Sequence, residues 1–266
     1  MTATTLDRHA GQAAPRPGIA RTAAHLAVRE VRTVLRTPAA LVPSLAIPVF
    51  IYLVTIAMFE GYAAQFGITG WEAFMIPVAV LFAVSNGSAG QNLVADIERG
   101  YFDKILTTPT SRLALLLGAM AGDLLRIAAQ SALALAVGVL VAGGLATGVS
   151  GALALIGLAA YWGLAYTAIG FAVAIRTGNA QATESTFLLF FPLMFLSPAF
   201  APREAMADWL AAAVAFNPMT YILEAMRTLT VHGWDREPLV TGVAVTTAVA
   251  AVTLSACLLA LRGRVR

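Results

Sequence analysis

The sequence predicts an all-α membrane protein with six transmembrane helices and both termini in the cytoplasm. Hydrophobic residues make up 59% of the 266 positions and charged residues only 12%, a composition far from that of a soluble domain. Long apolar runs alternate with short connectors, and the basic residues concentrate in alternate connectors. We therefore expect helices that cross a bilayer and are joined by loops in water.

The N-terminal part of the chain predicts two segments ahead of the first span. Residues 1–18 are polar, so we expect a flexible N-terminal tail rather than a signal peptide, with one membrane domain over residues 19–266. Residues 19–36 have a helical pattern, and a basic amphipathic helix at this place should lie in the anionic inner interface. The basic stripe of this interface helix consists of Arg21, His25, Arg29, Arg32 and Arg36.

The first two spans are predicted over residues 39–59 and 71–94. Residues 60–70 between them carry no Lys or Arg, which places this connector outside. The second half of the second span is polar, and such a run faces other helices or a wet cavity rather than lipid. Close helix packing explains it most simply, and contact with a transported substrate is the alternative. The candidate pathway residues are Asn86, Ser88, Gln91 and Asn92.

The remaining spans are predicted near residues 113–140, 152–175, from about 184 onward, and 239–261. Asp123 and Arg126 in the third span have i, i+3 spacing, which favours a structural ion pair over a proton relay. With this topology 14 of the 17 Lys and Arg residues fall on the cytoplasmic side. Such an excess is typical of cytoplasmic segments, so it supports six spans with both termini inside.

The connector between the second and third spans, residues 95–112, is the densest charged segment between spans and holds the only lysine, Lys104. After Gly100, four apolar side chains share one face of a short helix that Pro109 ends. A two-turn helix is not stable alone in water, so this one needs a surface. Lipid headgroups and a groove in a soluble partner both suit the pattern. The apolar face consists of Tyr101, Phe102, Ile105 and Leu106.

A second unusual stretch lies between the fifth and sixth spans. Residues 205–216 are apolar but too short to cross a bilayer, which predicts a re-entrant helical hairpin or interfacial helix on the outer side. Asn217 and Pro218 suit the N-cap and first residue of another short helix. Such a hairpin suits the closing of the outer mouth of a pathway, and a purely structural lid is the alternative. The candidate outer-gate residues are Pro198, Pro202, Trp209, Asn217, Pro218 and Arg227.

Together these two stretches resemble the type-2 permease family of ABC exporters, which includes drug- and polyketide-resistance permeases. The resemblance covers residues 20–261, and two positions depart from the family pattern. Pro198 stands where a glycine is usual, and Ala207 where a proline often occurs, so both changes affect the outer hairpin. The matching residues are Glu98-Arg99-Gly100, Pro109, Ser111-Arg112, Leu115, Phe195-Leu196-Ser197, Pro202, Asp208-Trp209-Leu210, Asn217-Pro218 and Arg227.

The resemblance implies a half-transporter of the bacterial plasma membrane. Two six-span permease halves associate, with a homodimer favoured, and each binds a cytoplasmic ABC ATPase through the helix in residues 95–112, the coupling helix. ATP and magnesium would bind to that ATPase, and we expect no cofactor or metal in this chain. Lipid is the other expected partner, and nucleic acid is not expected. The implied ATPase-coupling residues are Glu98, Arg99, Gly100, Tyr101, Phe102, Ile105 and Leu106.

The sequence also indicates that the chain is a transport subunit rather than an enzyme. Lys104 is flanked by Asp103 and Ile105, so no Gly-Lys-Ser/Thr phosphate-binding loop is present, and ATP hydrolysis requires a separate polypeptide. We therefore predict an exporter of a hydrophobic or amphipathic drug, natural product or lipid. A lipid-linked glycan is an alternative substrate. An ion-gradient-driven secondary transporter is the alternative mechanism, although Asp123 and Glu184 lie nearer the cytoplasmic side than the membrane midplane.

Overall fold

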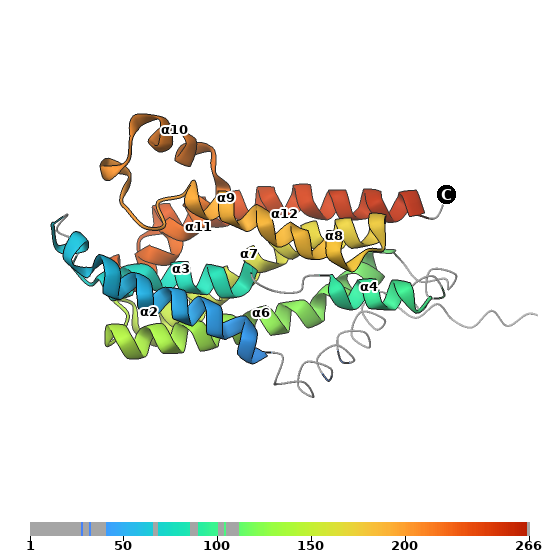
Figure 1. The fold of residues 1–266 in the computed structure, drawn as a ribbon, viewed down its shortest axis with the longest axis horizontal. Coiled ribbons are helices and arrows are strands. Elements are labelled where there is room, and N and C mark those ends of the chain that lie inside the picture. Colours follow the sequence, from blue (N-terminus) through green and yellow to red (C-terminus); the bar gives the residue numbers. More distant parts are fainter. Residues whose placement is uncertain are drawn as a thin grey trace, which may run out of the picture.

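The computed structural model describes residues 28, 32, 41–65, 69–85, 90–100, 104 and 112–264. All regular secondary structure in these residues is helical, which confirms the predicted all-α class. The long helices run along the long dimension of the molecule, and their connections lie at its two ends (Figure 1).

Within the described part of the chain, four helices are long and apolar enough to cross a membrane. They correspond to the predicted first, third, fourth and sixth spans. The first helix continues past Glu60 to Gln65, into residues that the sequence predicted as a connector. Ala and Gln favour a helix in water as well as in a membrane, so the end of an apolar run need not end the helix. The four helices are α2 (Leu41–Gln65), α6 (Arg112–Ala142), α7 (Gly148–Thr177) and α12 (Arg236–Arg264).

The predicted second span is divided into α3 (Trp71–Ser85) and α4 (Gln91–Glu98). Gly90, which precedes α4, has φ +79°, a conformation that strains any residue with a side chain. The site is also tight, because a Cβ on Gly90 would lie 3.2 Å from the backbone of Gly170 in α7. The break in this segment therefore lies where its backbone approaches α7 closely.

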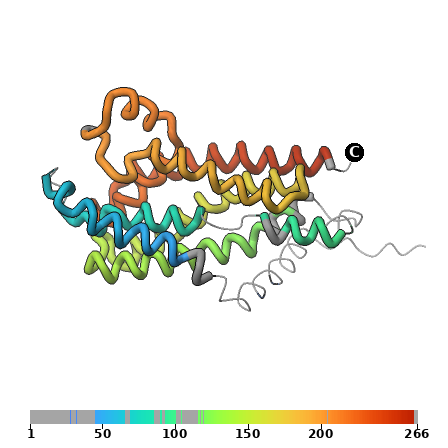
Figure 2. Tube along the Cα trace, in the orientation of Figure 1, coloured from blue at the N-terminus to red at the C-terminus, as the bar shows by residue number. Residues whose placement is uncertain are grey.

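The predicted fifth span consists of short helical pieces. They are α8 (Ala180–Glu184), the 3₁₀ turn η2 (Ser185–Leu189) and α9 (Phe190–Phe195). The chain then turns through η3 (Arg203–Ala205) into α10 (Asp208–Phe216), which projects from the body of the molecule (Figures 1 and 2). The helix α11 (Pro218–Arg227) and the π-helical turn η4 (Thr228–His232) bring the chain back to α12.

The core forms around α3, the most enclosed of the described helices. Twelve of its 15 residues are buried, and it packs against α2, α6, α7 and α11. Its first turn is held by Tyr52 of α2, whose hydroxyl donates to the carbonyl of Glu72 at 3.0 Å. At Gly163 of α7 an added Cβ would lie 2.5 Å from Val84 and 2.8 Å from Ile127. Helices α3, α6 and α7 therefore meet without space between them.

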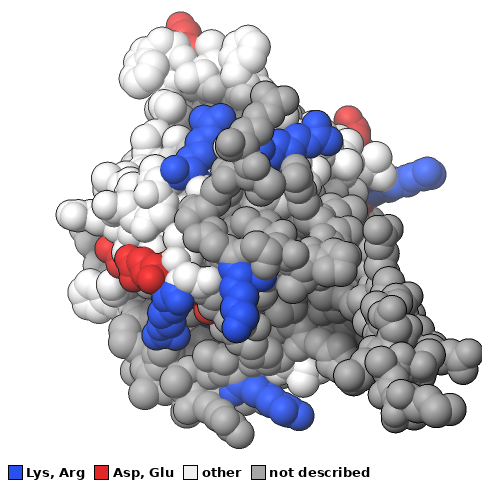
Figure 3. Space-filling model, turned by 90° about the vertical axis from the view of Figure 1, so that its right-hand side faces the viewer, with Lys and Arg blue, Asp and Glu red and all other residues white. Residues whose placement is uncertain are grey.

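A second apolar cluster packs α4 against its neighbours, at the end of the molecule next to the predicted coupling helix. Leu93, Val94 and Ile97 of α4 are buried in it together with residues of α6, α7 and α12. Lys and Arg side chains lie around this end of the molecule (Figure 3). The exposed basic residues of the segments that end here are Arg99, Lys104, Arg176 and Arg262.

The contact between α11 and α12 predicts a destabilising substitution. A Cβ on Gly242 would lie 2.6 Å from the Cβ of Ala225 and 2.9 Å from the carbonyl oxygen of Tyr221, so Gly242→Ala must push the two helices apart. We expect a loss of about 1–3 kcal/mol, typical of overpacking, measured as a lower thermal unfolding midpoint in detergent. Gly263→Ala in the same helix is the matched control, because nothing lies within 4 Å of the added atom. Equal midpoints for the two variants would contradict this packing.

Candidate functional site

The buried side chain of Arg227 joins three separate segments at the outer-hairpin end of the molecule. It is the last residue of α11 and is 6% exposed. Its Nη1 donates to the carbonyl of Pro198, its Nη2 to that of Ala199 at 2.7 Å, and its Nε to that of Phe74 at 3.3 Å. The guanidinium carbon also lies 3.5 Å from the centroid of the Phe74 ring. Helix α11 is thereby bound to α3 and to the turn that follows α9.

These contacts explain how a charged group is accommodated in this position. Carbonyl oxygens and an aromatic face both stabilise a cation, and bonds to a charged donor are the stronger kind. Burial lowers the pKa of Arg227 to about 9, while the nearby carboxylate of Glu224 raises it. The guanidinium therefore keeps its charge at neutral pH. Removing it would leave buried carbonyl oxygens unpaired, at a cost of about 1–3 kcal/mol.

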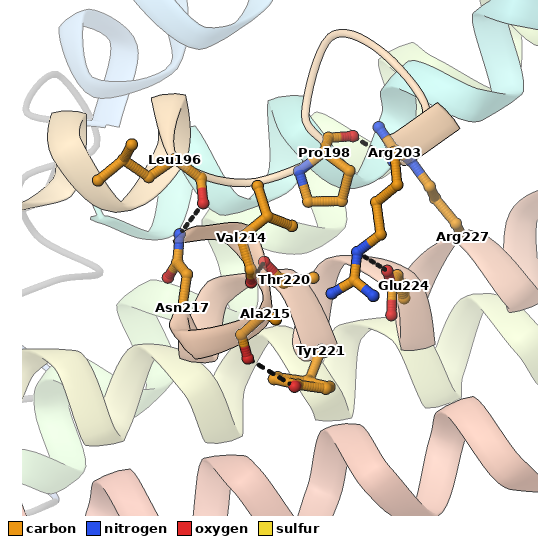
Figure 4. Close-up of polar contacts among 10 residues, drawn as sticks. All are labelled: Leu196, Pro198, Arg203, Val214, Ala215, Asn217, Thr220, Tyr221, Glu224 and Arg227. Atoms are coloured by element: carbon orange, nitrogen blue, oxygen red, sulfur yellow. Dashed lines mark hydrogen bonds and ion pairs between the residues drawn. The ribbon is translucent and has the colours of Figure 1, made fainter. Parts of the chain in front are cut away.

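Asn217 acts on the same turn from the start of α11. Its Nδ2 donates to the carbonyl of Leu193 in α9 at 2.5 Å. It also donates to the carbonyl of Leu196, which follows α9, at 2.6 Å (Figure 4). Its Oδ1 accepts the backbone N–H of Met219 at 3.0 Å, and Pro218 is the first helical residue, as the sequence predicts. One side chain therefore pairs carbonyls at the end of α9, which lack helical partners, and caps α11.

We refer to Arg227, Asn217 and the five carbonyls that they bind, at residues 74, 193, 196, 198 and 199, as the outer clamp. Two further hydrogen bonds connect the end of α10 to α11 (Figure 4). The hydroxyl of Thr220 donates to the carbonyl of Val214 at 2.8 Å, and that of Tyr221 to the carbonyl of Ala215 at 2.7 Å. The clamp fixes α9, α10 and α11 relative to one another.

The structure brings together most of the predicted outer-gate residues. Pro198, Asn217 and Arg227 meet in the clamp, and Pro202 lines the same pocket as Pro198 and Arg227. Trp209 is instead 70% exposed on α10. Sequence reasoning missed Phe74, which lies 153 residues before Arg227 and had no local signal other than its place in an apolar span.

The predicted ion pair in the third span forms. Arg126 Nη2 lies 3.0 Å from Asp123 Oδ1, and the two side chains are 14% and 9% exposed. The Asp123 carboxylate also lies near the backbone N–H of Gly90. The pair on α6 therefore also contacts the break between α3 and α4, a contact that the i, i+3 spacing did not indicate.

The predicted ATPase-coupling and interface residues are only partly described. Glu98, Arg99 and Gly100 are exposed at the end of α4, and Gly100 has φ +69°. Among the interface residues Arg32 is helical and exposed. Gln91 and Asn92 begin α4. The predictions for these residues stay predictions, and those that lie outside the described residues are Tyr101, Phe102, Ile105, Leu106, Arg21, Arg29, Arg36, Asn86 and Ser88.

Comparison with known proteins places both stretches in one family. The ABC-2 type transporter family model matches residues 23–230, a range that includes α4, the predicted coupling helix and the outer clamp. The daunorubicin resistance ABC transporter permease protein DrrB1 of Streptomyces coeruleorubidus is 29% identical over 210 residues, which are 74% of this chain and 72% of that protein. Because the family match spans most of the chain, the chain belongs to the ABC-2 type transporter family and is a multi-pass membrane permease.

Proposed function

We propose that this chain is the transmembrane subunit of an ATP-driven ABC exporter. The observation that carries the proposal is the family match over residues 23–230, which includes both the coupling segment and the outer clamp. The chain contains no phosphate-binding loop, so ATP would be hydrolysed by a separate cytoplasmic subunit. Two copies of the permease would form the transport unit, with one ATPase on each.

The proposed topology has six spans. Besides the four long helices, the α3–α4 and α8–α9 segments also run between the two ends of the molecule (Figure 1). The end that carries Arg99, Lys104, Arg176 and Arg262 would face the cytoplasm, because basic residues concentrate in cytoplasmic connectors. The outer clamp lies at the opposite end and would face outward.

The packing of α4 supports a route for coupling. Leu93, Val94 and Ile97 anchor α4 against α6, α7 and α12, and the coupling helix follows immediately after Gly100. A displacement of the coupling helix by the ATPase would move α4 first. The break at Gly90, next to Asp123, is where α4 would turn relative to α3.

The proposed substrate is a hydrophobic or amphipathic molecule. DrrB1 is named for daunorubicin resistance, and the apolar composition of the spans suits a similar class of compound. In this scheme ATP binding drives the cytoplasmic ends of the two permeases together, and the outer clamps separate as rigid bodies to release the substrate. A lipid-linked glycan is the alternative substrate.

The first test concerns the docking face of the coupling helix. Tyr101→Asp combined with Phe102→Asp should abolish co-purification with the cognate ABC ATPase in detergent, because two carboxylates cannot enter an apolar groove. Thr107→Asp is the matched control, because helical spacing places Thr107 on the face opposite to Tyr101 and Phe102, so this variant should retain the ATPase. Membrane insertion is checked for every variant. Retention of the ATPase by the double variant would contradict the assignment of this face.

The second test concerns the outer clamp. Asn217→Asp keeps the capping oxygen but turns a carboxylate toward the carbonyls of Leu193 and Leu196, so we expect a loss of about 1–3 kcal/mol and faster tryptic cleavage at Arg203. The control is Asn179→Asp, where the side chain caps α8 through the N–H of Ala182 and an aspartate suits that position equally well. Thermal unfolding and limited proteolysis measure both variants. Equal proteolysis rates would show that the clamp does not hold the hairpin.

The third test separates the two energy sources. In inverted vesicles that contain the permease and its ATPase, uptake of daunorubicin should require ATP and should continue when a protonophore collapses the proton gradient. Loss of uptake with the protonophore, with no dependence on ATP hydrolysis, would support the secondary transporter instead. A catalytically inactive ATPase variant controls for passive binding of the drug.

A further inference from the structure

A pocket of about 300 Å³ opens beside the outer clamp. Segments far apart in the sequence form it: the first turn of α3, the turn after α9, helix α11, η4 and the start of α12. Its four ionisable lining residues among those described are Arg203, Glu224, Arg227 and His232. The function proposed above assigns no role to this pocket.

The charges around the pocket do not balance. Arg203 and Arg227 contribute two guanidinium groups, whereas Glu224 is the one acidic residue among the described lining residues. Arg227 is bound to carbonyl oxygens, which carry no net charge. The pocket therefore carries an excess of positive charge and favours an anionic ligand.

The guanidinium of Arg203 has hydrogen-bonding capacity that remains unused within the described residues. Its Nε lies 3.7 Å from Oε1 of Glu224 (Figure 4), close enough for an ion pair but too long for a hydrogen bond. Both Nε and Nη2 are covered by protein atoms and have no hydrogen-bond acceptor among the described residues, although the side chain as a whole is 38% exposed. A guanidinium presents its donors in a planar fork that matches the oxygens of a phosphate group.

An aromatic residue near the pocket indicates its depth in the membrane. Trp234, which is 60% exposed, lies two residues after His232. Tryptophan is enriched at the headgroup level of both leaflets, where phospholipid phosphates are the abundant anions. We propose that this pocket binds the phosphate group of a phospholipid, with hydrogen bonds from Arg203 and an electrostatic contribution from Arg227. Bound lipid would brace the outer clamp from the bilayer.

The test counts the phosphatidylglycerol molecules that the purified full-length chain retains. Wild type and variants are exchanged into phosphatidylglycerol vesicles, extracted in detergent and measured by native mass spectrometry. Arg203→Gln should weaken retention about tenfold, because it removes charge-assisted hydrogen bonds. Glu224→Gln should strengthen retention, because it removes the competing carboxylate. Arg236→Gln is the control, since this exposed residue begins α12 at the same end but does not line the pocket.

Two results would overturn the proposal. The first is equal retention by wild type and Arg203→Gln, with both proteins shown to be folded by their thermal midpoints. The second is displacement of the lipid by inorganic phosphate at a similar concentration, which would identify a site for free anions instead. ATPase co-purification and ATP-dependent uptake do not depend on this pocket, so its failure leaves the exporter proposal intact.

Discussion

The outer half of this permease depends on the buried guanidinium of Arg227 and the backbone carbonyls that it binds. A helix that ends inside or near a bilayer leaves its last carbonyls without partners, and lipid cannot supply donors. Helix α9, which contains Pro192, ends in this way shortly before Pro198. Arg227 and Asn217 supply the donors from α11, so the positions of α9, α10 and α11 become fixed together.

The break between α3 and α4 also has a charged side chain from another helix beside it, but here that side chain is an anion. Between α3 and α4 the N–H of Gly90 lies near the carboxylate of Asp123, which pairs with Arg126. A carboxylate thus lies beside the start of one helix, whereas an amide and a guanidinium pair acceptors at the end of another. Each break in a span has a polar side chain from another segment beside it. Broken spans beside continuous ones give a transporter places to bend without exposing backbone to lipid.

The lipid pocket and the outer clamp share Arg227, so the two proposals describe one assembly at the outer surface. The same guanidinium that fixes the hairpin contributes positive charge to the pocket beside it. Arg203 lies in η3, on the stretch between α9 and α10 whose first residues the clamp holds. A phospholipid bound there would link the projecting α10 region to the surrounding bilayer. Movement of the hairpin during transport would then change the contact between protein and lipid.

The sequence by itself determined the class of the protein and its local caps. Apolar length and the placement of arginine follow from composition along the chain, and Asn217-Pro218 starts a helix through its immediate neighbours. Only the tertiary structure decided which distant segments come into contact. Phe74 meets Arg227 across 153 residues, and Gly90 meets Gly170 because two backbones approach closely. The coupling face around Tyr101 stays a sequence prediction. Periodicity shows which face of a helix is apolar, but the surface that covers it depends on distant segments and partners.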